Sequence, residues 1–325
     1  MRTMLLSMVC FVAFCLSVRA QEDEIEALKA KADGGDAKAQ CALGYRYYLG
    51  DGLEQNFKEA VKWYKAAADQ KFPLAQFALG RCYYYGDGVE EDKVKALEWM
   101  EKAAEQDFIK AMLFIGLDYV DVDEKPAESA VKWLTKAAEK GNAEAQYVLG
   151  MRYLVGDGVE ADPQTAIQWL EQAAEQDYDA AQFELGIRYF RGSILEKNPD
   201  LAVKWLTKAA EKGNALAQYS LGVCYKTAFG VKKDDAMAAE WFKKSAEQGN
   251  PDAQYALGVA YYLGKGVLRD YDSAKNWLKK SLDKGNHKAR RFYQEHEKKL
   301  WKYSDDTPDK KKEEPTNQPK VKIGK

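Results

Sequence analysis

The two histidines are the residues whose type best suits metal binding or acid–base catalysis. His287 and His296 stand nine residues apart, whereas ligands on one helical face recur every three or four residues. The pair is therefore not spaced to hold a metal ion from one helix. We interpret both histidines as surface residues and expect no metal site and no cofactor.

Nucleophilic and phosphate-binding patterns are also missing from the sequence. No cysteine, serine and histidine form an arrangement that suggests a nucleophile with its base, and no glycine-rich phosphate loop follows a strand. The paired acids Glu90 and Glu91 are interpreted as a solvated rim. We therefore expect a protein that is not an enzyme.

Short acidic loops recur along the chain and could, by composition, suggest calcium. Gly50-Asp51-Gly52 has counterparts that begin at residues 86, 156 and 264, but these lack the further oxygen ligands of a calcium loop. Glycine at such a loop allows the positive φ angles that end a helix and reverse the chain. We interpret the loops as turns.

Seven of the eight tryptophans follow one regular spacing, which identifies the elements that must position any site. The intervals are 36 residues, apart from one of 34. A fixed period of this length is typical of one supersecondary unit stacked on copies of itself. The seven are Trp63, Trp99, Trp133, Trp169, Trp205, Trp241 and Trp277.

Each unit is predicted to begin with a helix that carries Ala-Gln, then Leu-Gly, then Tyr. In the first unit these are Ala39-Gln40, Leu43-Gly44 and Tyr47. Their spacing of four places them on one helical face. Because glycine lowers helix propensity, its presence here predicts close approach of a partner helix.

A second helix is predicted to follow an Asn or Asp that can accept hydrogen bonds from its first amides. Pro163 and Pro199 occupy the first helical position. Ala60, Trp63 and Ala67 form the predicted buried stripe of the first unit. The capping column is Asn56, Asp92, Asp162, Asn198, Asp234 and Asp270.

The combined motif resembles the Sel1-like repeat, a relative of the tetratricopeptide repeat with a longer loop between its helices. The resemblance covers residues 36–285 in seven copies. It implies an all-α fold, a right-handed superhelical solenoid of antiparallel helix pairs. Residues 121–124 and 192–194 depart from the glycine loop, and we expect the helices around them to stay intact.

Five parts are expected along the chain. Residues 1–20 are a predicted signal peptide, 21–35 an N-terminal capping helix, 286–303 a C-terminal capping helix and 304–325 a disordered charged tail. Between the caps stand the seven repeats, 36–71, 72–107, 108–141, 142–177, 178–213, 214–249 and 250–285.

The first twenty residues have the pattern of a cleavable secretory signal. Arg2 precedes an apolar run from Met4 to Val18, which is short for a membrane span, and Val18-Arg19-Ala20 offers a cleavage site. We expect a protein that is secreted or located in a bacterial periplasm. No later segment is apolar enough to cross a membrane.

The charge of the chain argues against nucleic acid as a partner, and the cysteines are not placed to form disulfides. The formal net charge of −2 lacks the basic footprint of a nucleic-acid-binding protein. Cys82 and Cys224 occupy equivalent positions of distant repeats, and Cys41 is offset from Cys82 by more than a helical turn, so we expect no disulfide. We expect a monomer.

The first helices carry apolar and aromatic residues on the face directed away from the second helix, where an isolated pair would be polar. The column at Phe77 is interpreted mainly as packing between repeats, whereas the column at Tyr48 could equally be packing or a contact surface. In the family these helices line the concave side. The resemblance thus implies a binding surface whose candidate residues are Tyr45, Tyr48, Arg81, Tyr84, Tyr85, Met151, Leu154, Phe190, Arg191, Lys226 and Tyr262.

The sequence favours a scaffold or adaptor that binds a protein or peptide on this face. Aromatic residues and arginine are the types that anchor protein interfaces. The alternative is a carbohydrate-binding protein of the cell envelope, in which the tyrosines would stack on sugar rings.

Overall fold

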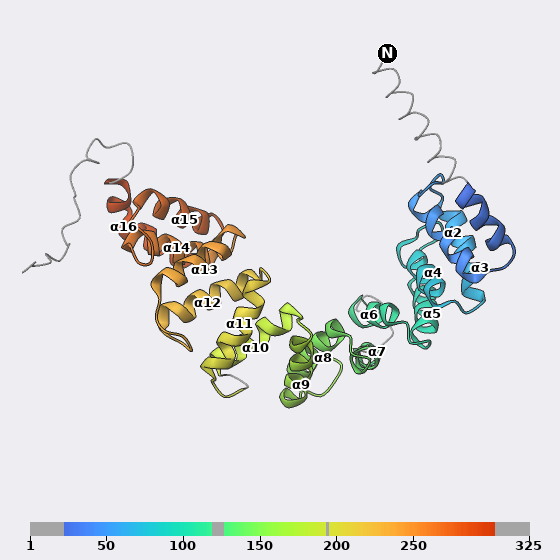
Figure 1. Cartoon of the computed structure of the whole chain (residues 1–325), viewed down its shortest axis with the longest axis horizontal. Coiled ribbons are helices and arrows are strands. Elements are labelled where there is room, and N and C mark those ends of the chain that lie inside the picture. The colour runs from blue at the N-terminus through green and yellow to red at the C-terminus, as the bar shows by residue number, and fades with distance from the viewer. Residues whose placement is uncertain (1–22, 119–126, 193–194, 303–325) are drawn as a thin grey trace, which may run out of the picture. The chain divides into compact units, whose positions relative to one another are not determined.

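The fold consists of paired α-helices that follow one another along the chain (Figure 1). The computed structural model describes residues 23–118, 127–192 and 195–302, and none of these is in a β-strand. The expected signal peptide, the tail and residues 121–124 lie outside the described residues. Residues 23–33 are helical. They are followed by α2 (Ala37–Leu49), α3 (Phe57–Asp69), α4 (Pro73–Tyr85), α5 (Lys93–Ala104), α6 (Ile109–Asp118), α7 (Ala127–Glu139), α8 (Ala143–Val155), α9 (Pro163–Glu175), α10 (Asp179–Arg191), α11 (Pro199–Glu211), α12 (Ala215–Thr227), α13 (Asp235–Glu247), α14 (Pro251–Leu263), α15 (Tyr271–Asp283) and α16 (His287–Lys302).

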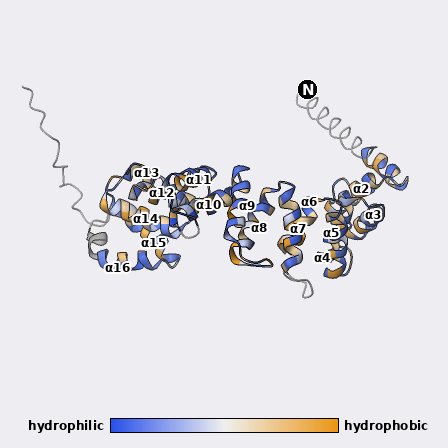
Figure 2. Ribbon diagram, turned by 90° about the horizontal axis from the view of Figure 1, so that it is seen from below, coloured by the Kyte–Doolittle hydropathy of each residue, from blue (hydrophilic) through white to orange (hydrophobic). Residues whose placement is uncertain are grey.

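The chain divides into two compact units, one ending at Trp169 and one beginning at Leu170. In the first unit each helix from α2 to α8 packs against the next, and in the second unit the same holds from α10 to α16. The all-α repeat fold expected from the sequence is confirmed in both units. Hydrophilic and hydrophobic residues alternate along the helices (Figure 2). None of the described helices is long and apolar enough to cross a membrane.

The second helices begin where the sequence predicts. Asp92 Oδ1 accepts from the amide of Lys95 at 2.9 Å, and Asn198 Oδ1 accepts from the amide of Leu201 at 3.0 Å. These bonds satisfy amides that have no partner within the helix. The remaining predicted caps, at Asn56, Asp162, Asp234 and Asp270, accept in the same way.

The glycine of the Leu-Gly pair lies where the second helix of the same repeat comes closest. A Cβ built on Gly44 would lie 2.8 Å from Tyr64 Cδ1 and 3.1 Å from the carbonyl oxygen of Ala60. Any side chain at this position would therefore separate the two helices. The predicted reason for this glycine is confirmed, and the same crowding recurs at Gly80, Gly116, Gly186, Gly222 and Gly258.

The two glycines of the loop have different roles. Gly86 ends α4 in the left-handed conformation, with φ 75°, as predicted. A Cβ on Gly88 would lie 2.4 Å from the carbonyl oxygen of Phe57, at the start of the preceding repeat's second helix. The loop therefore also contacts the preceding repeat, a role that the sequence analysis did not assign.

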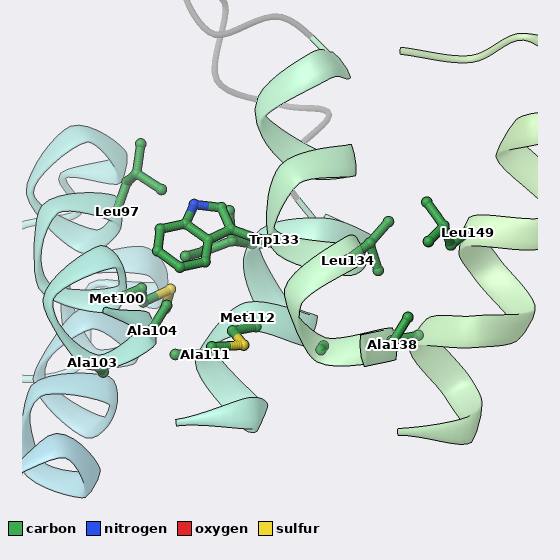
Figure 3. Packing of buried hydrophobic residues seen from close by; sticks show 13 residues of the cluster. Leu97, Met100, Ala103, Ala104, Ala111, Met112, Trp133, Leu134, Ala138 and Leu149 are labelled. Carbon is green, nitrogen blue, oxygen red and sulfur yellow. The ribbon is translucent and has the colours of Figure 1, made fainter. Parts of the chain in front are cut away.

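The tryptophans pack backward onto the preceding repeat and are not the deepest residues of their helices. Trp133 of α7 faces Leu97 and Met100 of α5, whereas Leu134, the next residue, is directed toward α8 (Figure 3). Trp63 and Trp99 are half-buried. The predicted buried stripe is confirmed for Ala60 and Ala67 and corrected for Trp63. The column that follows the tryptophans forms the centre of the core, namely Tyr64, Met100, Leu134, Leu170, Leu206, Phe242 and Leu278.

The glutamine of the Ala-Gln motif links successive helices through its amide. Gln76 Nε2 donates to the carbonyl oxygen of Ala68 at 3.3 Å, and its Oε1 accepts from Gln106 Nε2 at 2.7 Å. A buried amide needs such partners, because an unpaired polar group costs about 1–3 kcal/mol. The glutamines with the same bond to a residue eight positions earlier are Gln40, Gln146, Gln182, Gln218 and Gln254.

Candidate functional site

The three described cysteines are free and buried, which makes them unreactive. Burial raises the pKa of the Cys41 thiol to about 11 and the pKa values of Cys82 and Cys224 to about 12. A thiol is nucleophilic as the thiolate, so these side chains are protonated and unreactive near neutral pH. They fill space in the core.

The histidines do not form a site together. His287 is exposed, but His296 stacks on Phe292 with ring centroids 4.2 Å apart, and its Nδ1 lies 2.9 Å from the Phe292 carbonyl oxygen. The expectation of a surface role is therefore corrected for His296, which packs within α16. In the part of the chain that the structure describes, no group of three or more His, Cys, Asp and Glu could hold a metal ion.

A pocket of about 280 Å³ opens on the first helices of the first unit, between α2, α4 and α6. It brings together Tyr45, Tyr48 and Arg81, three residues of the predicted surface. Tyr64 of α3 also lines it. The remaining lining residues are Leu74, Phe77, Ala78 and Lys110.

The second unit has a pocket at the equivalent seam between repeats. Its volume is about 200 Å³, and it lies between α12, α13 and α14. Lys226 stands at the repeat position of Tyr48, Phe242 at that of Tyr64, and Val259 at that of Arg81. Both pockets are therefore built from one repeat and the first helix of the next, and Lys110 of the third repeat also lines the first pocket.

Five predicted surface residues are exposed. Tyr45 and Tyr85 are 56% and 53% exposed, and the Arg81 guanidinium carbon lies 5.6 Å from the Tyr85 ring centroid. An arginine over an aromatic face at this distance is a cation–π contact. Arg191 and Lys226 are exposed on α10 and α12.

The predicted column at Tyr48 packs against the following repeat. The Tyr48 hydroxyl donates to Asp87 Oδ2 at 2.6 Å, and this hydrogen bond raises the pKa of Tyr48 to about 12. Tyr84 meets Phe114 edge to face at 5.1 Å, and Phe190 meets Phe229 at 4.7 Å. These rings therefore keep only part of their surface accessible.

Tyr262 was predicted to lie on the contact surface, but the structure buries it. It is 7% exposed and packs edge to face against Tyr271 and Phe292, with ring centroids 5.5 and 5.2 Å away. The expectation failed because α16 covers this end of the repeats, where an inner repeat would meet its next copy. Met151 and Leu154 of α8 are half-buried.

The Phe77 column packs between repeats, as interpreted. The Phe77 ring lies 5.5 Å from Phe108 and 6.0 Å from Phe114 of the next repeat. Tyr255 meets Phe292 in a similar way at 6.1 Å. Offset and edge-to-face rings at these distances stabilise the seam.

The polar residues of the first pocket that sequence reasoning missed are Tyr64 and Lys110, and the apolar Leu74 and Ala78 were also not predicted. The evidence for Tyr64 was present in the sequence, because its column otherwise holds Met, Leu or Phe. A single tyrosine in a column of otherwise apolar residues indicates that its hydroxyl has a role in that repeat alone. Lys110 gave no such indication, because lysine at the surface of a helix is common.

Comparisons with known proteins agree with this architecture. The Sel1 repeat pattern matches seven consecutive segments, 37–72, 73–108, 111–142, 143–178, 179–214, 215–250 and 251–286. Forty residues are 45% identical to the secretory immunoglobulin A-binding protein EsiB of Escherichia coli, a match that covers 12% of this chain and 8% of EsiB.

Two solved structures are similar over most of the chain. One is c5321, described as a protective antigen of uropathogenic Escherichia coli with an SLR fold; it is 35% identical, with a TM-score of 0.78, over 84% of this chain and 59% of that one. The chain thus spans little more than half of c5321. The other is a Sel1 repeat protein from Oxalobacter formigenes, 37% identical with a TM-score of 0.71, over 86% of this chain and 81% of that one. With seven matched repeats and helix pairs built on the same motif, the chain belongs to the Sel1 repeat family.

Proposed function

We propose that this protein is an exported scaffold that binds a protein or peptide on the face formed by its first helices. The observation that carries the proposal is the pocket where Tyr45, Tyr48 and Arg81 come together. A counterpart at an equivalent seam of the second unit includes Lys226. Pockets that each unit forms on its own first helices suit a ligand that is contacted by several repeats.

The chemistry of the exposed residues supports a protein ligand. Aromatic side chains and arginine contribute strongly to protein interfaces, because they bury large areas and also form polar contacts. Tyr45, Tyr85 and Arg81 supply this combination, and the nearby Leu74 is 45% exposed. Arg191 on α10 adds a similar contact in the second unit.

Export is part of the proposal and rests on residues 1–20. Their apolar run and cleavage pattern favour secretion or a periplasmic location. EsiB is named as an immunoglobulin-binding protein, which supports a binding role without identifying the ligand of this chain. We further propose that the protein acts as a monomer and without a cofactor, and that it is not an enzyme.

The carbohydrate-binding alternative has less support. It needs several open tyrosine faces, but the Tyr262 ring is covered, and those of Tyr48 and Tyr84 pack edge to face on their neighbours. Tyr45 and Tyr85 remain exposed. Retention of the protein on envelope polysaccharide, lost in a Tyr45→Ala, Tyr85→Ala variant, would favour this alternative.

The test is peptide selection on the full chain, followed by affinity measurement. Random peptides displayed on phage would be selected against the protein and measured by fluorescence polarisation. Tyr45→Ala combined with Arg81→Ala should weaken binding at least tenfold, because truncating a central interface residue costs 2 kcal/mol or more.

The matched control changes the opposite helices. Lys102→Ala and Lys136→Ala remove lysines that cover Trp99 and Trp133 on second helices. These variants should bind like the original protein. Binding that is lost in the control and kept in the first-helix variant would contradict the proposed face.

A further inference from the structure

The floor of the first pocket contains a buried tyrosine whose hydroxyl has no hydrogen-bond partner among the described residues. Tyr64 is 3% exposed and lines the pocket, and its hydroxyl makes no hydrogen bond to any described residue. It is also not among the fully enclosed unpaired polar atoms of the described chain. The hydroxyl therefore remains in contact with the open space of the pocket. Burial raises the pKa of Tyr64, so the group remains a donor.

Two positively charged side chains line the same pocket and have no acidic partner among the described residues. Arg81 and Lys110 line it and are exposed, and neither forms an ion pair among the described residues. Arg46 and Arg152, on the first helices of other repeats, pair with Asp51 and Asp157 at 2.8 and 2.7 Å. Arg81 instead lies over the Tyr85 ring.

The acidic side chain that binds the pocket residue Tyr48 is Asp87, which already has a donor. Asp87 Oδ2 accepts the Tyr48 hydroxyl at 2.6 Å, and Asp87 is not part of the pocket lining. The polar groups directed at the pocket are therefore mainly donors and positive charges, set among apolar side chains. Such a site favours an anion with a short apolar stem.

We propose that this pocket binds the side-chain carboxylate of a glutamate or aspartate in a partner peptide. The Tyr64 hydroxyl donates to the carboxylate at the floor, while Arg81 and Lys110 neutralise it from the rim. Leu74 and Phe77 cover the stem. This inference rests on the proposed function and names the chemistry of its ligand.

The size of the pocket favours a side chain over a larger ligand. Pockets for drug-sized ligands usually measure about 300–1,000 Å³, and this pocket is about 280 Å³. A side chain can reach Tyr64 while its main chain stays at the rim. A peptide C-terminus would have to bring its backbone to the floor.

The equivalent pocket of the second unit serves as an internal comparison. There Phe242 replaces Tyr64 and Val259 replaces Arg81, while the lining charges are Lys226, Asp235 and Lys265. It lacks a hydroxyl at the floor and includes an acid. Lys102→Gln, on the second helix α5 and outside the linings of both pockets, is the matched control for the loss of one positive charge.

The experiment uses the full chain and an array of short peptides, with each sequence present as a Glu form, a Gln form and a Glu form with an amidated C-terminus. Affinities are measured at low and high salt. The original protein should prefer Glu over Gln about tenfold or more, and amidation should have no effect. Tyr64→Phe should lower this preference about tenfold, because it removes one hydrogen bond to a charged group. Arg81→Gln with Lys110→Gln should bring the ratio of Glu to Gln affinity close to one and remove the salt dependence of this ratio.

Each outcome decides the question. Equal affinity for the Glu and Gln forms would overturn this inference and leave peptide binding intact, whereas no binding of any peptide would overturn the proposed function itself. A preference kept in Tyr64→Phe, or lost in Lys102→Gln, would overturn the assigned residues. Loss on amidation would assign the pocket to a C-terminus. Circular dichroism and thermal unfolding of Tyr64→Phe check that its fold is unchanged.

Discussion

Lys71 adopts a backbone conformation that glycine holds in most other repeats. Its φ is 63°, and the equivalent Gly35, Gly141 and Gly213 have φ of 88°, 84° and 95°. A residue with a Cβ is strained in this left-handed region, whereas glycine adopts it freely. The chain thus carries local strain at the end of α3.

Lys71→Gly is expected to stabilise the protein by about 0.5–1 kcal/mol, since the strain is relieved and helix ends favour glycine here. The free energy of unfolding in urea measures the change. Gly35→Ala is the reverse control: it should destabilise by strain alone, because a Cβ at Gly35 meets nothing within 4 Å. An unchanged or lower stability of Lys71→Gly would contradict this account.

At the residue scale, the sequence predicted the capping residues of the helices better than the depth of individual core residues. Asn56 and Asp92 were predicted as caps, because few residue types can serve there. Trp63 and Trp99 were placed too deep, because neighbouring positions of a helix differ by 100° and both can face the core in part. Regular spacing located the helix face but did not identify its deepest residue.

At the scale of elements, amides connect the helices of successive repeats. Gln248 Nε2 donates to Gln218 Oε1 at 2.8 Å. In the last repeat Lys284 replaces this donor, and its Nζ binds the Gly249 carbonyl oxygen at 2.6 Å. Gln254 Oε1 is left enclosed and unpaired among the described residues. The α14–α15 pair therefore lacks one hydrogen bond that the α12–α13 pair has.

Lys284→Gln should restore this bond and stabilise the second unit by about 1 kcal/mol, the net value of a typical hydrogen bond. Hydrogen exchange in α14 and α15, together with urea unfolding, would detect it. Gln248→Lys is the matched reverse change and should destabilise the α12–α13 pair. If both variants shift stability in the same direction, the amide contact does not account for the effect.

The candidate site was predicted in part because each first helix has several neighbours. The sequence indicated an apolar outer face, but α4 contacts both its own second helix and that of the preceding repeat. Little of its circumference remains free. Tyr48 and Tyr84 were thus drawn into seams, while Tyr45 and Tyr85, a few residues away, stayed exposed. Which ring is used for packing depends on distances that one sequence does not provide.

At the scale of the whole molecule, the last helix closes the second unit. Phe292 of α16 packs with Tyr262 and Leu278, which are 7% and 0% exposed. In a repeat protein each repeat depends mainly on its neighbours, so the ends need a cover. The N-terminal residues 23–33 cover the other end, with Ala32 packed against Leu43.

Truncation after Asn286 should expose Tyr262 and Leu278 and increase hydrogen exchange in α14 and α15 at least tenfold. The helices of the first unit should keep their exchange rates, because stability propagates between neighbours. Deleting only residues 304–325 is the control and should leave α14 and α15 unchanged. Equal effects in both units would show that the chain unfolds as one cooperative block.

The position of the pockets at seams means that recognition is encoded by neighbouring repeats acting together. The first pocket takes Tyr64 from the first repeat, Arg81 from the second and Lys110 from the third, while the close approach of Gly44 to Tyr64 is made within one repeat. Exchanging the order of repeats would therefore create new ligand preferences from old parts while keeping the internal packing of each repeat. Gene duplication and shuffling of repeats can therefore change the ligand of such a protein without requiring a new hydrophobic core.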